Sequence, residues 1–458
     1  MKNILKLLTA ALVMAGCSKG FLEEQPSSKI FTPEKVADFQ RLLDNFDMIG
    51  HTSVLPQLSA DEYYIVSESS WLSSRTAVER NSYIWEEDVY GGEVDIDEWN
   101  IPYRTVFYAN SIISQIDRAG GPDGGDGGLR DVYGQALFHR ARANYDLLKN
   151  YSVPYDESTA SRDLGIPLRK DPSVDYNQPR STVEECYDLI FDDLVRSIDL
   201  LASTGPIPQR NRATKLASYA MLSRICLYRR EYGLAEKWAD EFLKRYDVLI
   251  DYNTLSSTSV APFTRTNEEL IMFGISTKYN NASSYSSART FFVDTALIEL
   301  YDRDDLRRSV YFFERDPGRY VMKTGYNGIA LVPFTGMAVD EVVLNRAECQ
   351  ARGNRLDQAA QSMNRLLEKR YREGTYEPIT YQDREVALVH ILQERRKELV
   401  WRCLRWDDIK RLNKEGANIT LKRVLGGREF ILLPNSPRYV FNIPQDEINR
   451  SGIEQNKR

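Results

Sequence analysis

A tryptophan in a serine-rich stretch is the first residue whose type suits ligand binding. Trp71 lies within residues 67–75, where serines surround it and the apolar positions follow neither a helical nor a strand period. An indole ring that stacks on a sugar or another flat ligand removes apolar surface from water, which contributes roughly 25 cal/mol per Å2. Trp71 is therefore a candidate ligand contact. The alternative is that its ring packs down onto the protein body.

A second polar stretch, residues 278–289, mixes tyrosine, asparagine and serine and ends in an arginine. It contains Tyr279, Asn280, Tyr285 and Arg289. Tyrosine rings offer flat apolar faces, amide groups donate and accept hydrogen bonds, and a guanidinium donates them. These four residues join Trp71 as candidate ligand contacts. The alternative is a solvated loop whose tyrosines lean on the surface.

Signals for covalent chemistry are weak in comparison. The histidines His51, His139 and His390 are isolated, and no His-Glu-x-x-His zinc helix exists. Carboxylates are abundant, but no pair stands out as the acid and base of a glycosidase. The Gly- and Asp-rich residues 122–128 lack the ligand series and closing Glu of a calcium loop. We therefore expect a protein that is not an enzyme, with no catalytic residue, cofactor or metal ion.

The start of the chain has the pattern of a lipoprotein export signal. Lys2 precedes an apolar run over residues 4–13, and two small residues stand directly before Cys17. The run is about half the length needed to span a bilayer. We expect residues 1–16 to be removed as a signal peptide, Cys17 to be acylated, and residues 17–30 to form a polar tether.

Composition argues against a nucleic-acid-binding protein and leaves enough chain for one or two hydrophobic cores. Sixty basic and 66 acidic residues give a net charge of −6, whereas a nucleic-acid-binding protein usually carries an excess of basic residues. The other cysteines, Cys186, Cys226, Cys349 and Cys403, lie far apart in apolar patterns and form no CxxC pair. We expect them to be small buried thiols rather than zinc ligands or disulfides.

The hydrophobic period is mainly helical from Val132 onward. Thr182 and Glu185 have the spacing of a capping box and begin a helix that runs to Leu201. The other expected helices cover residues 132–150, 214–230, 234–245, 339–352, 355–371 and 383–412.

Two of these regions have the spacing of tetratricopeptide-type hairpins. Small residues recur twelve positions apart, at Ser223 and Ala235 and again at Ala347 and Ala359. Arg395 falls within the apolar stripe of the last helix, so we expect it to pair with a carboxylate, either Glu398 or an acid from another helix.

The chain resembles the SusD/RagB family of outer-membrane lipoproteins in motifs that span nearly its whole length. The most specific is residues 393–399 (QERRKEL) followed by residues 404–411 (LRWDDIKR). Between them the family usually has Glu-Gly, whereas this chain has Trp401-Arg402-Cys403, so the local packing is expected to differ. Further matches include Trp99, Tyr103, Ala109-Asn110, Arg140-Ala141-Arg142, Asn345-Arg346-Ala347-Glu348 and Phe441-Asn442-Ile443-Pro444.

The resemblance implies a mostly α-helical SusD-like fold with tetratricopeptide-type helix pairs, irregular loop-rich regions and a few short strands. Residues 31–458 would form one domain, with ligand-binding loops inserted around residues 61–95 and 250–335. The motif residues Glu394, Arg395 and Arg396 would be structural.

The resemblance also implies a cell-surface position and a partner. Such a protein would be lipid-anchored in the outer membrane, capture a nutrient, most simply a glycan, and deliver it to a SusC-like TonB-dependent transporter. Two alternatives stay open: capture of peptides or another nutrient at the same location, and a periplasmic helical-repeat scaffold protein.

Overall fold

A stack of antiparallel helices forms the larger part of the molecule. The computed structural model describes residues 35–123, 127–173, 177–283, 289–328 and 331–458. Neighbouring helices of the stack contact one another in the order α7, α8, α9, α10, α11, α14, with α15 and α16 on α14. The long helices are α7 (Asp97–Arg118), α8 (Gly127–Tyr151), α9 (Val183–Leu200), α10 (Lys215–Tyr228), α11 (Tyr232–Leu243), α14 (Val339–Arg352), α15 (Leu356–Leu367), α16 (Arg384–Glu398) and α17 (Arg405–Lys414).

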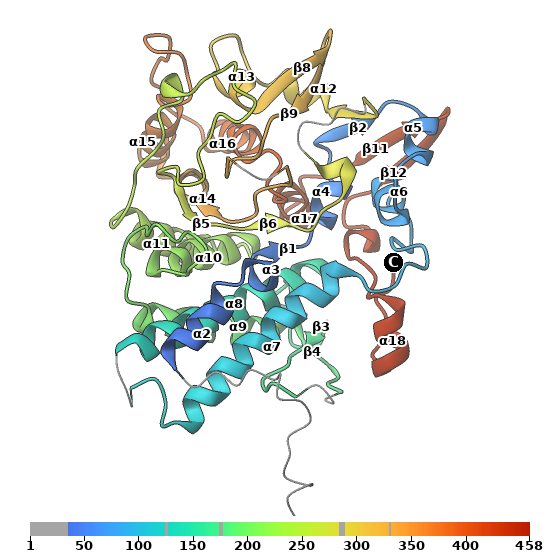
Figure 1. Ribbon diagram of the computed structural model, residues 1–458. Helices are drawn as coiled ribbons and strands as arrows, with labels where there is room; N and C mark the ends of the chain where they lie inside the picture. The colour runs from blue at the N-terminus through green and yellow to red at the C-terminus, as the bar shows by residue number, and fades with distance from the viewer. Residues whose placement is uncertain (1–34, 124–126, 174–176, 284–288, 329–330) are drawn as a thin grey trace, which may run out of the picture.

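Shorter elements cover one side and the top of this stack in the view of Figure 1. The short helices are α2 (Val36–Leu43), α3 (Phe46–Ile49), α4 (Leu55–Ser59), α5 (Glu68–Leu72), α6 (Ala77–Tyr83), α12 (Thr295–Ile298), α13 (Arg307–Tyr311), α18 (Gln445–Ser451), η2 (Tyr252–Thr254), η3 (Asn280–Ala282) and η4 (Pro437–Tyr439). No helix of the described residues is both long and apolar enough to cross a bilayer.

The strands pair two by two, so the described residues contain no larger sheet. β1 with β6 is parallel, whereas the other pairs are antiparallel: β10 with β5, β11 with β12, β2 with β7, β3 with β4, and β8 with β9. Their bounds are β1 (His51–Thr52), β2 (Tyr63–Ile65), β3 (Leu164–Pro167), β4 (Arg180–Thr182), β5 (Leu270–Met272), β6 (Ile275–Ser276), β7 (Phe291–Val293), β8 (Phe312–Asp316), β9 (Arg319–Met322), β10 (Met337–Ala338), β11 (Leu421–Leu425) and β12 (Arg428–Leu432).

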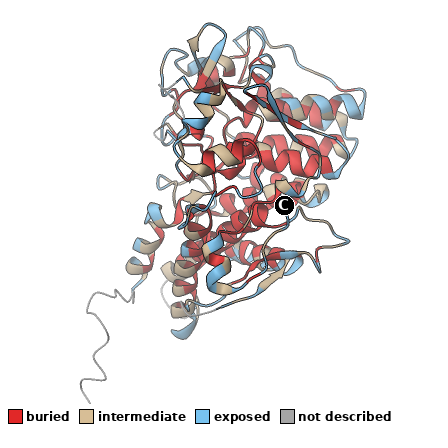
Figure 2. Ribbon diagram, turned by 90° about the vertical axis from the view of Figure 1, so that its right-hand side faces the viewer, coloured by how far each residue is buried: buried red, intermediate tan, exposed pale blue. Residues whose placement is uncertain are grey.

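The expected helical scaffold is confirmed, including its local chemistry. Thr182 and Glu185 form the reciprocal capping box at the start of α9, with the Thr182 amide donating to the Glu185 carboxylate at 2.8 Å. The Ser223 hydroxyl donates to the Ala235 carbonyl oxygen at 3.1 Å, so the small residues do let α10 and α11 approach closely. Figure 2 shows buried residues concentrated in the helices of the interior, and α10 and α14 are buried at most of their positions.

The buried cysteines and the buried arginine are also as expected. Cys186, Cys226, Cys349 and Cys403 are free and buried. Arg395 donates its Nε to Asp408 of α17 at 2.9 Å and a terminal nitrogen to Asn345 of α14. The carboxylate partner therefore comes from another helix and not from Glu398.

One expectation is wrong: residues 383–412 do not form a single helix. The chain leaves the helical path after Glu398 and begins α17 at Arg405. Trp401 and Cys403 adopt left-handed φ values of 60° and 56°, which a helix cannot include. Buried partners hold this bend, because the Trp401 amide donates to Glu62 at 3.2 Å and Arg402 pairs with Asp340.

A glycine beside β10 allows two backbone segments to come together. A methyl group added at Gly336 would collide with the carbonyl oxygen of Met272 in β5, the partner strand of β10. We expect Gly336→Ala to lower the free energy of unfolding by about 1–3 kcal/mol, the usual effect of overpacking. Thermal denaturation measures this. Gly233→Ala is the matched control, because its methyl group would meet no atom within 4 Å, and equal destabilisation by both variants would contradict the prediction.

Candidate ligand-binding surface

The serine-rich stretch around Trp71 is a short helix rather than the irregular segment that its sequence suggests. Ser67 caps α5, its hydroxyl oxygen accepting the amide of Ser70 at 3.0 Å. Trp71 is half-buried against the hydrophobic cluster under β2 and β7, and its indole nitrogen donates to the Arg80 carbonyl oxygen at 2.9 Å. Part of the Trp71 ring therefore packs down, and what it can offer a ligand is ring surface and not its N–H group.

The second polar stretch comes to lie directly beside the first. The Asn281 side chain donates to the Ser74 hydroxyl at 2.9 Å, and the Asn281 amide donates to Glu79 of α6 at 2.9 Å. The Trp401 indole, in the bend after α16, donates to the Ala282 carbonyl oxygen at 2.8 Å. Two segments separated by more than 200 residues are thus brought together, with η3 held against the scaffold.

Within η3 and its flank, the candidate residues differ in how much they expose. Asn280 is exposed, and Tyr279 is half-buried with its hydroxyl 3.4 Å from a carboxylate oxygen of Glu98. Arg289 is exposed and forms an ion pair with Asp316 at 3.2 Å. The Thr290 carbonyl oxygen accepts the Val66 amide, which places Arg289 near the start of α5. Tyr285 and Cys17 lie outside the described residues.

A tyrosine that sequence reasoning missed extends this surface. In β2 the side chains alternate, so that Tyr63 is fully buried and Tyr64 is only half-buried. The Tyr64 ring lies 6.1 Å from the ring of Phe292 on β7, centroid to centroid. The adjacent Tyr63-Tyr64 pair was a usable signal, because neighbouring residues of a strand point to opposite faces. We call Tyr64, Trp71, Tyr279, Asn280 and Arg289 the candidate surface.

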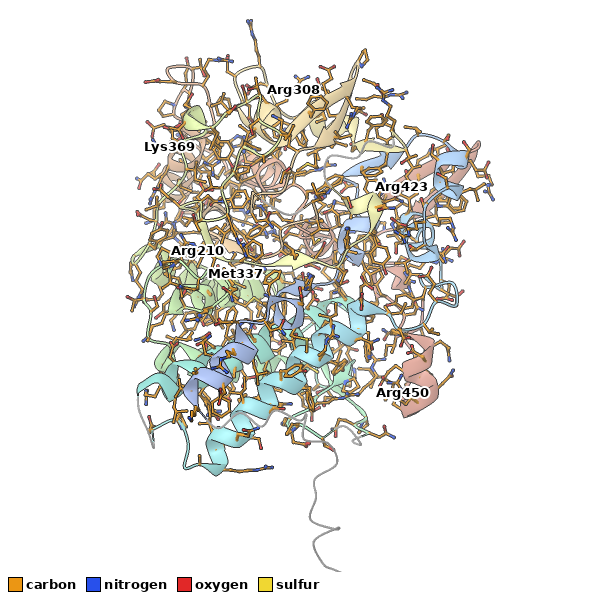
Figure 3. The ribbon with its side chains drawn as sticks, viewed as in Figure 1. Arg210, Arg308, Met337, Lys369, Arg423 and Arg450 are labelled. Atoms are coloured by element: carbon orange, nitrogen blue, oxygen red, sulfur yellow. The ribbon has the colours of Figure 1, made fainter. Side chains whose placement is uncertain are left out.

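The β11–β12 hairpin supports α5 from below. Arg423, labelled in Figure 3, is buried and donates to the carbonyl oxygens of Tyr63 and Ala60. Its guanidinium also lies 4.3 Å from the ring centre of Tyr83. On the outer side, Arg428 of the hairpin pairs with Glu68 of α5. The hairpin therefore contacts α5 through the Arg428–Glu68 ion pair and holds the neighbouring segments β2 and α6 through Arg423.

A buried carboxyl group lies beneath the candidate surface. Glu98 is almost fully buried and accepts hydrogen bonds from the hydroxyl groups of Thr277 and Tyr279, and it forms no ion pair within the described residues. Burial, only partly offset by the Thr277 hydrogen bond, raises the pKa of Glu98 to about 7. Glu98 thus positions Tyr279 and changes its protonation near neutral pH.

The arrangement suits non-covalent binding. Trp71 and Tyr279 are half-buried and Asn280 is exposed in two segments that contact each other, while Glu98, bonded to Tyr279, is nearly inaccessible. Among the described residues, no group of three or more His, Cys, Asp or Glu side chains is placed to hold a metal ion. Stacking and hydrogen bonding are what these side chains can supply.

A separate cavity of about 480 Å3 lies at the top of the molecule, beside α13 and the β8–β9 hairpin. Phe313 and Tyr320 line it, together with Arg308, which donates to the Tyr320 hydroxyl at 2.9 Å and is labelled in Figure 3. It belongs to the region 250–335 in which ligand-binding loops were expected, although none of the candidate residues lines it. Sequence reasoning missed it because its walls come from three separate segments.

Comparison with known proteins agrees with the fold and the motifs. A family model described as "Starch-binding associating with outer membrane" matches residues 20–227, and the SusD family model matches residues 327–457. Together they cover about three quarters of the chain. No curated protein matches it.

Solved structures with the same fold come from Bacteroides. A SusD superfamily protein of Bacteroides thetaiotaomicron is 20% identical with a TM-score of 0.73, covering 93% of this chain and 100% of that one. A SusD superfamily protein of Bacteroides vulgatus is 21% identical with a TM-score of 0.73, covering 93% and 99%. A SusD-like carbohydrate binding protein of Bacteroides vulgatus is 18% identical with a TM-score of 0.65, covering 92% and 97%. With the helical stack, the 393–411 motif and both family models in agreement, the chain belongs to the SusD/RagB family.

Proposed function

We propose that this chain is a nutrient-capturing lipoprotein of the outer membrane that binds a glycan and delivers it to a SusC-like TonB-dependent transporter. It is held by lipid on Cys17 and faces the cell exterior. The observation that carries the binding role is the contact of residues 67–75 with residues 278–283, which brings together two segments that carry the half-buried rings of Trp71 and Tyr279 and the exposed Asn280. A family member structure named as carbohydrate binding supports the choice of a glycan.

The strength of binding follows from the chemistry of the surface. One ring contributes little, because stacking against a sugar buries only a modest apolar area, at roughly 25 cal/mol per Å2. Tyr64, Trp71 and Tyr279 together supply three half-exposed rings. Asn280 and Arg289 would orient the sugar by hydrogen bonds to its hydroxyl groups. We therefore expect binding of an oligosaccharide rather than of a single sugar.

Calorimetry with a panel of polysaccharides, oligosaccharides and peptides tests this proposal on the purified full-length chain. We expect saturable binding of at least one glycan, and we expect Trp71→Ala to weaken it by about tenfold, since losing one stacking ring costs roughly 1–2 kcal/mol. Tyr285→Ala is run in parallel. Trp238→Ala on α11 is the matched control, because Trp238 is also half-buried but lies on the helical stack.

Three outcomes would count against parts of the proposal. If Trp71→Ala and Tyr285→Ala both leave the glycan affinity unchanged, the glycan does not bind at the candidate surface. The cavity beside Arg308 would then be the next site to test. Binding of peptides alone would replace the glycan by another nutrient. No binding of any ligand, together with the absence of a transporter gene beside this one, would favour a periplasmic scaffold.

A further inference from the structure

A cavity of about 400 Å3 lies far from the candidate surface along the chain and shares no residue with it. Its walls come from the end of α17, the segments on either side of β3, residues around η4, and the last residues of the chain, near the C-terminus marked in Figure 1. Its lining includes apolar and basic side chains, among them Val153, Arg162, Leu164, Lys414, Val440 and Lys457. The volume is within the range of small-molecule sites, which is roughly 300–1,000 Å3.

The floor of this cavity is apolar and partly open to water. Val153 and Leu164 remain 42% and 36% exposed, unusually high for large aliphatic side chains. Pro154, Pro437 and Val440 continue the same wall. Apolar side chains that line a concave surface gain stability when a ligand covers them, in proportion to the area removed from water.

The rim is basic although the protein as a whole is acidic. Five basic side chains line the cavity against two acidic ones, while the chain carries a net charge of −6. Of the five, Lys410 is buried and Arg180 donates to backbone carbonyl oxygens, so three remain for a ligand: Arg162, Lys414 and Lys457. Within the described parts of the chain, Arg162 and Lys457 form no ion pair, and Lys414 reaches Asp156 only at 3.4 Å. A concave site lined by one sign of charge concentrates ions of the opposite sign.

The wall formed by the last residues is fixed in place. Gln455 exchanges two hydrogen bonds of 2.8 Å with the backbone of Ile443, and Asn456 donates to the carbonyl oxygens of Tyr151 and Phe441. Arg180 donates to the Glu454 carbonyl oxygen at 3.0 Å. Terminal segments are usually loose unless such bonds hold them, so the cavity has a preformed shape.

We propose that this cavity binds a small organic carboxylate carried on an apolar body. The carboxylate lies at the rim between Arg162, Lys414 and Lys457, and the body covers Val153, Leu164 and Val440. Such a ligand matches both the apolar and the basic side chains of the lining, whereas a neutral sugar carries no charge to pair with the basic side chains. This site is independent of the proposed glycan-binding role, because it uses different residues on different elements.

Calorimetry of the full-length chain with 4-phenylbutyrate, and with 4-phenylbutanamide as its uncharged counterpart, tests the proposal. We expect the acid to bind at least about tenfold more tightly than the amide, with an affinity that falls as salt is added. Arg162→Gln and Lys414→Gln should each weaken binding of the acid by about threefold to fivefold, the effect of one partly exposed charge. Leu164→Asp should abolish binding.

Two controls keep the result separate from the glycan experiment. Lys244→Gln, a well-exposed lysine following α11, should leave binding of the acid unchanged, and so should Trp71→Ala. Equal binding of acid and amide would overturn the proposal, as would no binding of the acid up to millimolar concentration. An affinity for 4-phenylbutyrate that none of the variants Arg162→Gln, Lys414→Gln and Leu164→Asp changes would also overturn the proposal.

Discussion

Replacing Glu398 by alanine should lower the free energy of unfolding by about 3–5 kcal/mol, because it leaves two buried arginines without a shared partner. Glu398 is fully buried at the end of α16 and accepts Arg370 at 2.7 Å and Arg307 at 3.0 Å. Both guanidinium groups are themselves fully buried. The effect should appear as a large drop in the midpoint of thermal or urea unfolding.

The surrounding network explains why this position is so sensitive. Arg307 also pairs with Asp305 and Glu394, and Arg370 pairs with Glu269. These groups come from α13, α16 and the segments after α11 and α15. The Glu398 carboxylate therefore connects elements that are far apart in the sequence. The neighbouring carboxylates raise the pKa of Arg307 well above its usual value against the opposing effect of burial, which keeps the guanidinium charged.

Glu385→Ala is the matched control on the same helix. Its side chain is well exposed, and within the described residues its ion pair is with Arg384, so the free energy of unfolding should fall by less than about 1 kcal/mol. Glu398→Gln keeps the shape and removes the charge, and it should fall between the wild type and Glu398→Ala. An effect of Glu398→Ala no larger than that of Glu385→Ala would show that the network does not stabilise the fold.

The second large effect is a dependence of stability on pH that Glu98→Gln removes. Burial raises the pKa of Glu98 from its usual 4.5 to about 7. Between these values the folded protein holds a proton that the unfolded chain has lost. The contribution of Glu98 to the free energy of unfolding is therefore at its maximum below pH 4.5 and is lost as the pH rises through 7. The stability of Glu98→Gln relative to wild type should thus increase by up to about 3 kcal/mol from pH 4.5 to pH 8.

The difference between variant and wild type is the quantity to measure, because other buried groups titrate in the same range. Burial also raises the pKa of Glu62 to about 7, which adds a contribution of the same sign. Burial lowers the pKa of His139 to about 3, so the unfolded chain binds the extra proton and stability falls as pH falls below 6.5. Urea unfolding of the wild type and of Glu98→Gln from pH 5 to 8 gives the difference in their free energies of unfolding, which contains the contribution of Glu98 alone. A difference that stays constant with pH would contradict the raised pKa.

Much of the helical scaffold could be predicted from the sequence because its rules are local. The Thr182 capping box, the small residues Ser223 and Ala235, and the apolar period of α14 and α15 each act within a few turns of helix. The rule that a buried charge must be paired also predicted that Arg395 has a carboxylate partner, although it did not identify Asp408.

The bend after α16 could not be predicted in the same way. Residues 383–412 have a continuous helical pattern, and the break at Trp401 and Cys403 depends on Glu62 and Asp340, which are distant in sequence. The departure from the family pattern at these positions was a hint of different packing and did not reveal a new helix boundary.

The ligand-binding role of the candidate surface stays a prediction, and its geometry was accessible from the sequence only in part. Residue types identified Trp71 and the segment around Tyr279, but the sequence could not reveal that Asn281 and Ser74 form a hydrogen bond. It also could not show that the Trp71 indole nitrogen is already bonded to the Arg80 carbonyl oxygen. Tyr64 was missed because its exposure depends on pairing of β2 with β7.

Hydrogen exchange on the purified protein, with and without the glycan that binds most tightly in the calorimetric panel, tests the central claim most directly. Binding at the candidate surface predicts slower exchange of the backbone amides of α5 and η3 when the glycan is present, with no change in α11. Protection confined to other parts of the chain, such as α13 and the β8–β9 hairpin, would contradict the claim and place the ligand elsewhere.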